Sequence, residues 1–177
     1  MRLITDPAEV ERRAEDLQEE NWAFRNWIKL NFDFDDHRLM AVVHGLTQEV
    51  TARIDCTQCA NCCRTTTTSV TMEDMERLAG ALGLDVPALQ NTYLEQDEQG
   101  DWQLPAPCGL LAGNLCSVYD ARPDACREYP HLHNDFRAAS ISRIENAYIC
   151  PIVFNVIQGM KIELRWPSRG RWEQLDW

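Results

Sequence analysis

Apolar residues recur every three to four positions along much of the chain, a spacing that predicts helices with one buried face. The longest such pattern covers residues 35–53, and a shorter one covers residues 6–20. A third helix is predicted to begin at Thr71, because Asp74 completes a capping box there, and to end at Gly83. The apolar residues of this third helix, which we expect to be buried, are Met72, Met75, Leu78, Ala79 and Leu82.

Elsewhere the patterns are shorter and indicate less regular structure. Residues 64–71 are β-branched and polar, which fits either a short strand or an extended arm. Residues 108–116 are predicted to form a hairpin, and Pro123 is placed to begin a short helix. Residues 138–149 fit a strand or a helix, whereas Pro151 can open a last helix. Together these patterns predict an α+β fold that is mainly helical, with helices around an irregular, cysteine-rich centre organised by metal.

A chain of 177 residues is expected to form a single domain. Within it we distinguish a helical N-terminal arm over 1–53, a cysteine-cluster region over 54–150, and a C-terminal helix and tail over 151–177. Hydrophobic residues make up 45% and charged residues 25%, which is the usual composition of globular proteins and allows a conventional core.

The formal net charge of −11 at pH 7 changes the expected partners. An acidic surface repels phosphate groups, so we expect no nucleic-acid partner and no binding to anionic membranes. The N-terminal segment contains no apolar signal region, and we find no apolar run long enough to span a membrane. These observations predict a cytoplasmic protein whose partners are metal ions, and they indicate no particular protein partner.

Eight cysteines carry the candidate chemistry. Four of them fall in the segment CTQCANCC, where each C-x-x-C turn can point two sulfurs at one metal ion. Thiols stay reduced in the cytosol, so clustered cysteines there more often bind metal or do redox work than form disulfides. The candidate metal ligands are Cys56, Cys59, Cys62, Cys63, Cys108, Cys116, Cys126 and Cys150.

Four interpretations of these cysteines compete. A disulfide framework is disfavoured because no secretory signal is present and the adjacent Cys62 and Cys63 make an awkward bridge. Simple burial of apolar cysteines does not explain a cluster this dense. Zinc remains open, since eight thiolates can fill two four-sulfur sites with Cys62 and Cys63 serving one site each or bridging two ions. An iron–sulfur cluster also remains open, because Cys56, Cys59 and Cys62 match part of the bacterial ferredoxin pattern.

Positive charges and helix starts near the cysteines are expected to favour thiolates. Arg64, Arg122 and Arg127 could donate hydrogen bonds to sulfur and offset its charge. Cys126 in the first turn of its predicted helix, and Cys150 at the start of another, would face the positive end of a helix dipole. Such a position lowers the pKa of a thiol.

The second group of cysteines carries a longer motif, C-x2-Y-x2-R-P-x2-C-R-x-Y-P. Together with CTQCANCC it resembles the CxxCxxCC family of zinc- or iron-chelating proteins, also called the YkgJ-like cysteine-cluster family, over residues 56–150. Ala60 stands where that family often has glycine. The residues that match the longer motif are Cys116, Tyr119, Arg122, Pro123, Cys126, Arg127, Tyr129 and Pro130, while Cys108 and Cys150 match further cysteines of the family.

The resemblance implies metal chelation and no particular reaction. We therefore expect a metal-binding protein in which thiolates hold zinc or iron in a structural role. The alternative is a redox or cofactor-dependent enzyme that contains an iron–sulfur cluster, as a related cysteine domain in flagellin lysine methylases suggests. No acid–base pair or nucleophile constellation is evident in the sequence, so whether the protein is an enzyme stays open.

Overall fold

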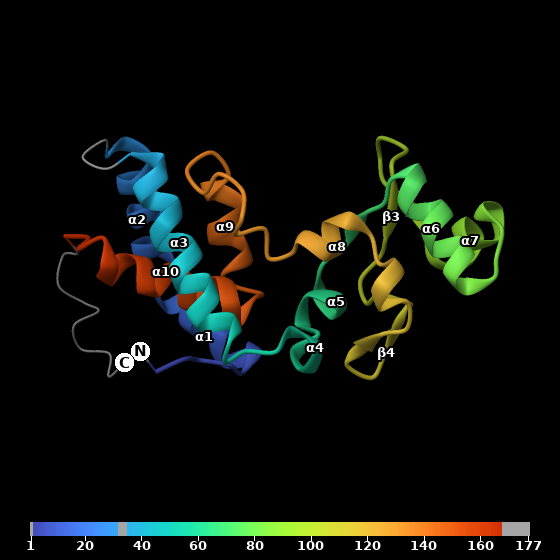
Figure 1. The fold of residues 1–177 in the computed structure, drawn as a ribbon, viewed down its shortest axis with the longest axis horizontal. Coiled ribbons are helices and arrows are strands. Elements are labelled where there is room, and N and C mark those ends of the chain that lie inside the picture. The colour runs from blue at the N-terminus through green and yellow to red at the C-terminus, as the bar shows by residue number, and fades with distance from the viewer. Residues whose placement is uncertain (1, 32–34, 168–177) are drawn as a thin grey trace. The chain divides into compact units, whose positions relative to one another are not determined.

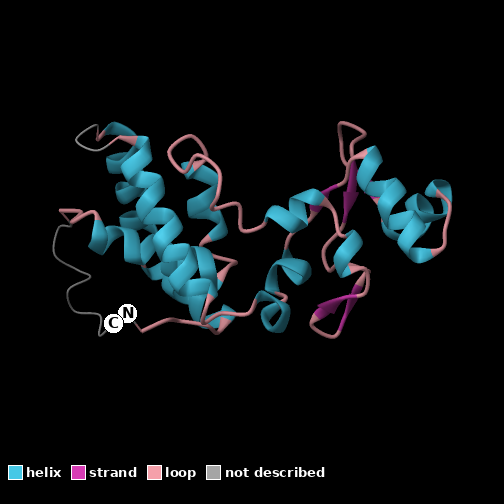
Figure 2. Ribbon diagram, viewed as in Figure 1, coloured by secondary structure: helices cyan, strands magenta, loops and turns pink. Residues whose placement is uncertain are grey.

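The computed structural model describes residues 2–31 and 35–167, and the predicted C-terminal tail after residue 167 lies outside them. The described residues form helices and two small sheets, which confirms a mainly helical α+β fold (Figures 1 and 2). The chain divides into two compact units: unit 1 comprises Met1–Asp55 and Pro130–Trp177, and unit 2 comprises Cys56–Tyr129. That the whole chain forms one domain stays a prediction. None of the described helices is both long and apolar enough to cross a membrane.

Unit 1 is a helical bundle centred on its last helix, which is buried from Pro151 to Lys161. This helix packs chiefly on α3, where Gly159 allows a close approach: a Cβ atom there would lie 2.8 Å from a methyl carbon of Leu46. Pro151 begins the helix, as predicted. The helices of unit 1 are α1 (Pro7–Asp16), α2 (Gln18–Leu30), α3 (Asp36–Thr51), α9 (Ser140–Asn146) and α10 (Pro151–Glu163).

The helix predicted over residues 6–20 is in fact two helices, because the chain leaves helical geometry at Leu17 and α2 then continues to Leu30. The apolar spacing continues through the second helix to Ile28, but the buried position between Leu17 and Phe24 is Asn21. Because Asn21 is polar, the spacing of apolar residues did not predict that the second helix continues past residue 20. The ambiguous residues 138–149 contain the helix α9.

A buried polar network explains how polar residues of α10 lie inside unit 1. The ammonium group of Lys161 donates to Glu20 Oε1 at 2.8 Å and to Asn21 Oδ1 at 2.7 Å. Gln158 donates to the same Asn21 oxygen at 3.1 Å. Buried polar groups are tolerated when they are hydrogen-bonded, so α10 can be surrounded by the other helices although it carries an amide and an amine.

Unit 2 consists of short elements. Its strands form an antiparallel sheet in the order β1–β3–β2 and a separate β4–β5 hairpin. The hairpin confirms the prediction for residues 108–116, and Gly113 at φ +65° supplies the left-handed residue of its turn. The elements are α4 (Cys56–Cys59), α5 (Asn61–Thr65), β1 (Thr68–Ser69), α6 (Met72–Leu82), α7 (Val86–Tyr93), β2 (Glu95–Gln96), β3 (Trp102–Leu104), β4 (Leu111–Ala112), β5 (Leu115–Cys116), a 3₁₀ turn (Tyr119–Ala121) and α8 (Asp124–Glu128).

The core of unit 2 lies around α6. The predicted capping box of Thr71 and Asp74 is present, and Gly83 ends the helix at φ 67°. Met72 is 57% exposed, so its predicted burial is wrong: it occupies the first helical position, and the buried face starts at Asp74 and Met75. The buried apolar residues of this core are Val70, Met75, Leu78, Ala79, Leu89, Leu94, Leu104, Leu110 and Val118.

Candidate metal centre

The CTQCANCC segment is helical rather than a loop. Cys56 and Cys59 lie on α4, and Cys62 and Cys63 lie on α5. The two short helices meet at Ala60, which adopts a left-handed conformation with φ 51° and ψ 18°. A residue other than glycine adopts this backbone conformation at a cost of roughly 1–2 kcal/mol. The chain therefore stores a small strain at the joint that sets the directions of the two cysteine pairs.

Seven of the eight predicted ligands lie in unit 2, and Cys150 lies in unit 1, where it is buried and precedes α10. Four of the unit 2 cysteines lie close enough for the charge of one to shift the pKa of another. We call them the four-thiol group; they are Cys63, Cys108, Cys116 and Cys126, and each carries a free thiol.

Backbone pairing places Cys63, Cys108 and Cys116 near one another. The amide of Cys108 donates to the carbonyl of Cys63 at 2.8 Å, which joins two segments far apart in the sequence. The amide of Leu111 donates to the carbonyl of Cys108 at 3.1 Å, and Leu111 is also paired with Cys116 across the hairpin. The hairpin therefore returns Cys116 to the neighbourhood of Cys108.

Cys126 completes the four-thiol group from α8. Its sulfur lies 3.7 Å from the hydroxyl oxygen of Thr68, and α8 packs on β1. Thr68 follows α5 closely in the chain, so this contact brings Cys126 to the end of the segment that carries Cys63.

The thiols of this group differ in acidity. A hydrogen bond from Cys62 is the main cause that lowers the pKa of Cys63 to about 6, and the charge of Arg64 acts in the same direction. Burial raises the pKa of Cys108, and raises that of Cys126 to about 11, with the charges of neighbouring cysteines adding to both shifts. We expected a helix dipole to lower the pKa of Cys126, but burial outweighs it. The helix α8 has only five residues, so few aligned peptide dipoles act on the thiol.

Arg64 ties α4 and α5 to the hairpin. It donates to the carbonyls of Cys59 at 3.0 Å and Gly113 at 2.9 Å, and also to the side-chain oxygen of Asn114. The Asn114 amide in turn donates to the carbonyl of Gln58 at 2.8 Å. These contacts hold the backbone that carries the cysteines.

The other two arginines of the predicted set act in a similar way. Arg122 donates to the carbonyl of Tyr119 at 2.6 Å, with its guanidinium 3.8 Å from the centre of the Tyr119 ring. Arg127 donates to the carbonyl of Asp120 at 2.9 Å. The expected donation to sulfur is thus replaced, in these bonds, by donation to the backbone that leads to Cys126.

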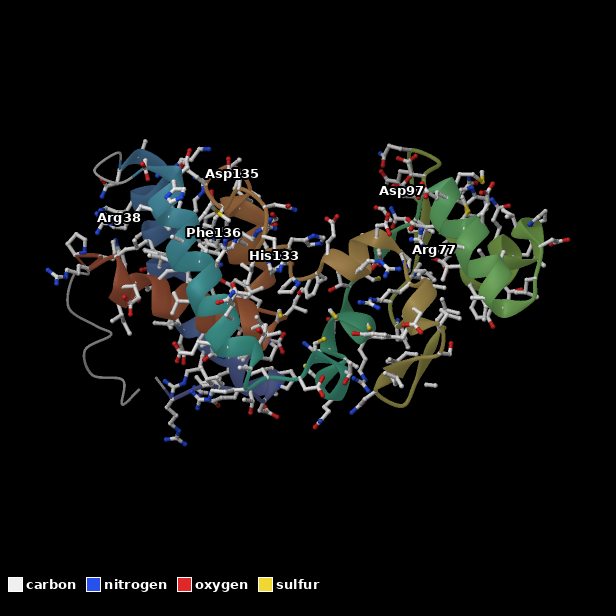
Figure 3. All side chains as sticks on the ribbon, in the orientation of Figure 1. Arg38, Arg77, Asp97, His133, Asp135 and Phe136 are labelled. Carbon is white, nitrogen blue, oxygen red and sulfur yellow. The ribbon has the colours of Figure 1, made fainter. Side chains whose placement is uncertain are left out.

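Asp74 connects the core of unit 2 to the helix that carries Cys126. Its carboxylate is 2% exposed and accepts hydrogen bonds from Thr71, from Arg77 and, at 3.1 Å, from the amide of Asp124 at the start of α8. Arg77, which is labelled in Figure 3, also donates to the Asp124 carboxylate at 2.7 Å. Burial alone would raise the pKa of Asp74, but these hydrogen bonds and the Arg77 charge lower it. The sequence indicated only the cap, because no local signal links Asp74 to Asp124.

The donor chemistry fits a soft metal such as zinc or iron, since thiolates are its preferred ligands. The sulfur positions do not yet form a coordination sphere. Within residues 2–31 and 35–167, no three His, Cys, Asp or Glu side chains stand in positions that could hold one ion. Zinc binds sulfur at about 2.3 Å, so the thiols would have to move inward to share an ion.

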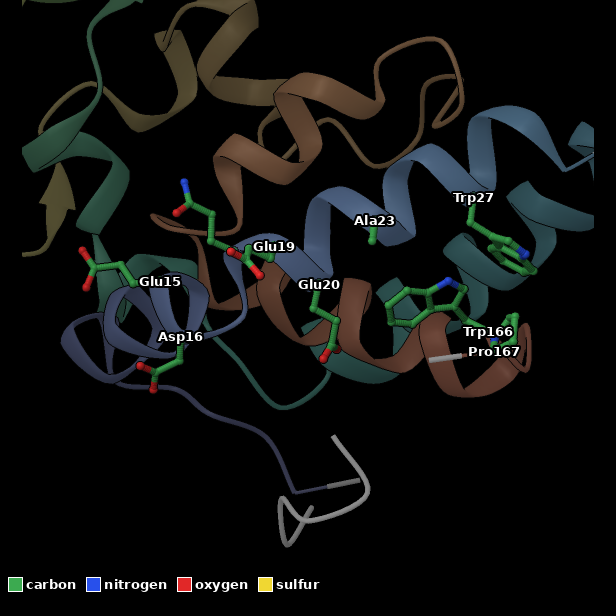
Figure 4. Close-up of a pocket in the computed structure, with 9 residues that line it drawn as sticks. Glu15, Asp16, Glu19, Glu20, Ala23, Trp27, Trp166 and Pro167 are labelled. Carbon is green, nitrogen blue, oxygen red and sulfur yellow. The ribbon is translucent and has the colours of Figure 1, made fainter. Parts of the chain in front are cut away.

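A pocket of about 900 Å³ lies in unit 1 and contains no cysteine (Figure 4). Acidic side chains and two tryptophans line it, and Glu20 also binds Lys161. The pocket therefore offers no sulfur ligand for a metal. Its lining residues are Glu15, Asp16, Gln18, Glu19, Glu20, Ala23, Trp27, Trp166 and Pro167.

Comparison with known families identifies the family of this chain. Residues 55–150 match the CxxCxxCC family model, described as a putative zinc- or iron-chelating domain, and these residues make up more than half of the chain. No curated protein and no solved structure matches the chain.

Proposed function

Because this chain belongs to the CxxCxxCC family of zinc- or iron-chelating domains, we propose that its thiolates hold a metal ion and that the ion stabilises the fold of unit 2. The proposed ligands come from the eight cysteines that the sequence singles out. Membership in the family supports metal binding. The structural role rests on how the cysteine-bearing elements are packed.

The observation that carries this role is that the helices bearing cysteines have little core of their own. α4, α5 and α8 together carry Cys56, Cys59, Cys62, Cys63 and Cys126, yet none of these helices has a buried residue. Helices of four or five residues are not stable in isolation, because too few hydrogen bonds offset the cost of ordering the first turn.

Metal–thiolate bonds would supply the cross-links that apolar packing does not provide in this part of unit 2. Small domains with little core commonly use a metal or disulfides for this purpose. In such domains the free energy of metal binding becomes free energy of folding. The buried apolar residues around α6 remain as a separate source of stability for the rest of the unit.

The test is to purify the full chain without oxygen, determine its metal by elemental analysis, and record its melting curve before and after a chelator. We expect zinc or iron in a fixed ratio to the chain and a lower melting temperature after chelation. Removal of the metal without any change in melting would contradict the structural role, and absence of retained metal would contradict the proposal altogether.

The same sample separates the two metals. A colourless protein with zinc fits a structural thiolate site. A brown protein with acid-labile sulfide contains an iron–sulfur cluster, and the alternative of a redox or cofactor-dependent enzyme would then replace the structural role.

A further inference from the structure

We propose that the pocket of unit 1 is the docking site of the chain segment that follows Pro167, and that Arg169 and Arg171 of this segment bind the carboxylates of the pocket. The segment, residues 168–177, lies outside the described residues, and its sequence is SRGRWEQLDW. The proposed contact belongs to unit 1 and does not depend on the metal binding proposed for unit 2. It would fasten the chain beyond α10 to the helices α1 and α2.

The pocket carries negative charge that its surroundings do not neutralise. Of the four carboxylates that line it, those of Asp16 and Glu20 are held in ion pairs by a neighbouring arginine and a neighbouring lysine. Among the residues that the structure describes, Glu15 and Glu19 form no ion pair, and both are exposed. A cation in the pocket would therefore be attracted by two carboxylates that have no counter-ion.

The rest of the pocket favours a guanidinium group as this cation. Trp27 and Trp166 lie at the opposite end of the pocket from Glu15 (Figure 4). Arginine suits both ends, because its planar guanidinium stacks on tryptophan and binds carboxylates through two hydrogen bonds. A metal ion is disfavoured, since no three His, Cys, Asp or Glu side chains in the described part of the chain stand where they could hold one.

The chain arrives at this pocket at the end of α10. Arg165 adopts a left-handed conformation with φ 52°, and the amide of Trp166 donates to the carbonyl of Lys161 at 2.9 Å. These two features together turn a chain back on itself at the end of a helix. Trp166 then packs edge-on against Phe24, with 5.5 Å between the ring centres, and Pro167 also lines the pocket. The segment after Pro167 therefore starts at the wall of the pocket.

Arg169 and Arg171 are near enough to Pro167 in the sequence to reach the unpaired carboxylates. An extended chain advances by at most about 3.5 Å per residue, which gives them reaches of about 7 and 14 Å. Glu19 and Ala23 both line the pocket and are four residues apart on α2, or roughly 6 Å along the helix axis. In an extended segment, residues two positions apart project from the same side, so both arginines could face the pocket.

The short connection also makes weak ion pairs sufficient. Exposed ion pairs contribute little to binding between separate molecules. A segment that is tethered beside its site, however, has a local concentration on the order of millimolar. The observation that carries the proposal is thus that Pro167 leads two arginines into a pocket whose Glu15 and Glu19 have no counter-ion.

Trypsin, which cuts after arginine, measures this contact in the full chain as purified. We expect the bonds after Arg169 and Arg171 to be cut at least about 3-fold faster in Glu15→Gln/Glu19→Gln than in the wild type, because two ion pairs are lost. Cleavage after Arg2, which is exposed and does not line the pocket, is the internal standard. Mass spectrometry of samples taken over time gives the rate at each bond.

The control Glu11→Gln/Glu49→Gln removes the same charge from exposed positions outside the pocket and should be cut at the wild-type rate. Sodium chloride at about 1 M should abolish the protection in the wild type, because it screens exposed charges. Equal rates in the wild type and in Glu15→Gln/Glu19→Gln would overturn the proposal and leave metal binding untouched. Protection that increases with protein concentration would overturn it too, since the segment would then occupy the pocket of a second copy.

A charge-exchange cycle provides an independent measurement. If Glu19 and Arg171 form a pair, the melting temperature of Glu19→Arg/Arg171→Glu should exceed the value expected from adding the two single shifts by about 1–2 °C. Glu11→Arg combined with Arg171→Glu is the matched control, and its shifts should add. Additive shifts in both combinations would contradict a contact between Arg171 and the pocket.

Discussion

Unit 1 and unit 2 are stabilised in different ways. In unit 1, helices of up to sixteen residues enclose α10, and every residue of α10 from Pro151 to Lys161 is buried. In unit 2, the cysteine-bearing helices have four or five residues and no buried side chain. Long amphipathic helices can thus stabilise a unit by packing alone, whereas short elements that carry cysteines need another kind of cross-link.

Metal removal should give the largest difference between the units. We expect chelation to destabilise the cysteine-bearing part of unit 2 by on the order of 10 kcal/mol, as in small zinc domains, and to leave α3 and α10 protected. Hydrogen exchange read by mass spectrometry, with and without chelator, measures each segment separately. If the chelator reduced protection from hydrogen exchange equally in both units, metal would not be what distinguishes the stability of unit 2 from that of unit 1.

The buried amine of unit 1 provides the next largest effect. Burial is the main cause that lowers the pKa of Lys161 to about 8, although Glu20 opposes the shift. Between pH 8 and the ordinary lysine value the unfolded chain binds more protons than the folded one, so the free energy of unfolding should rise with pH. The rise should reach up to about 3 kcal/mol.

Chemical denaturation of the wild-type chain and of Lys161→Met between pH 7.5 and 10.5 measures this effect. As the pH increases, the free energy of unfolding of the wild type should rise relative to that of Lys161→Met. Parallel curves would mean that Lys161 keeps its proton in the folded protein, and that burial does not control its pKa.

Asp74 tests whether the core of unit 2 supports its cysteine-bearing part. Asp74→Asn should lower the free energy of unfolding of unit 2 by about 1–3 kcal/mol, because buried partners lose a charged acceptor. It should also weaken metal binding by roughly 10-fold through the start of α8. Denaturation and metal titration measure the two effects. Glu73 is exposed and precedes Asp74 in the chain, so Glu73→Gln is the control for loss of a carboxylate. If Asp74→Asn lowers the stability and leaves the metal affinity unchanged, α8 is held in place independently of Asp74.

The smallest effect is expected at the joint between α4 and α5. Ala60→Gly should stabilise unit 2 by about 0.5–1 kcal/mol, because glycine adopts the left-handed conformation without strain. Ala52→Gly, at a right-handed position after α3, is the opposite control and should destabilise unit 1 by a similar amount. Melting curves of the two variants should therefore shift in opposite directions. A destabilised Ala60→Gly would mean that the joint carries no strain.

Features that depend on near neighbours in the chain could be predicted from the sequence. The capping box of Thr71 and Asp74, the end of α6 at Gly83 and the start of α10 at Pro151 each depend on residues within a few positions. The dense cysteine motif likewise indicated the family before any coordinates. The break at Leu17 could not be predicted, since the buried Asn21 obscures the helical pattern there.

The mainly helical class, the local starts and ends of helices, and the thiol-rich chemistry of residues 56–150 could all be inferred from the order of the amino acids. That Cys63, Cys108, Cys116 and Cys126 are neighbours, and that Asp74 reaches Asp124, became visible in the folded chain alone. Local elements follow from short-range backbone and side-chain preferences. The pairing of distant segments depends instead on hydrogen bonds such as that between Cys108 and Cys63, for which the chain carries no local signal.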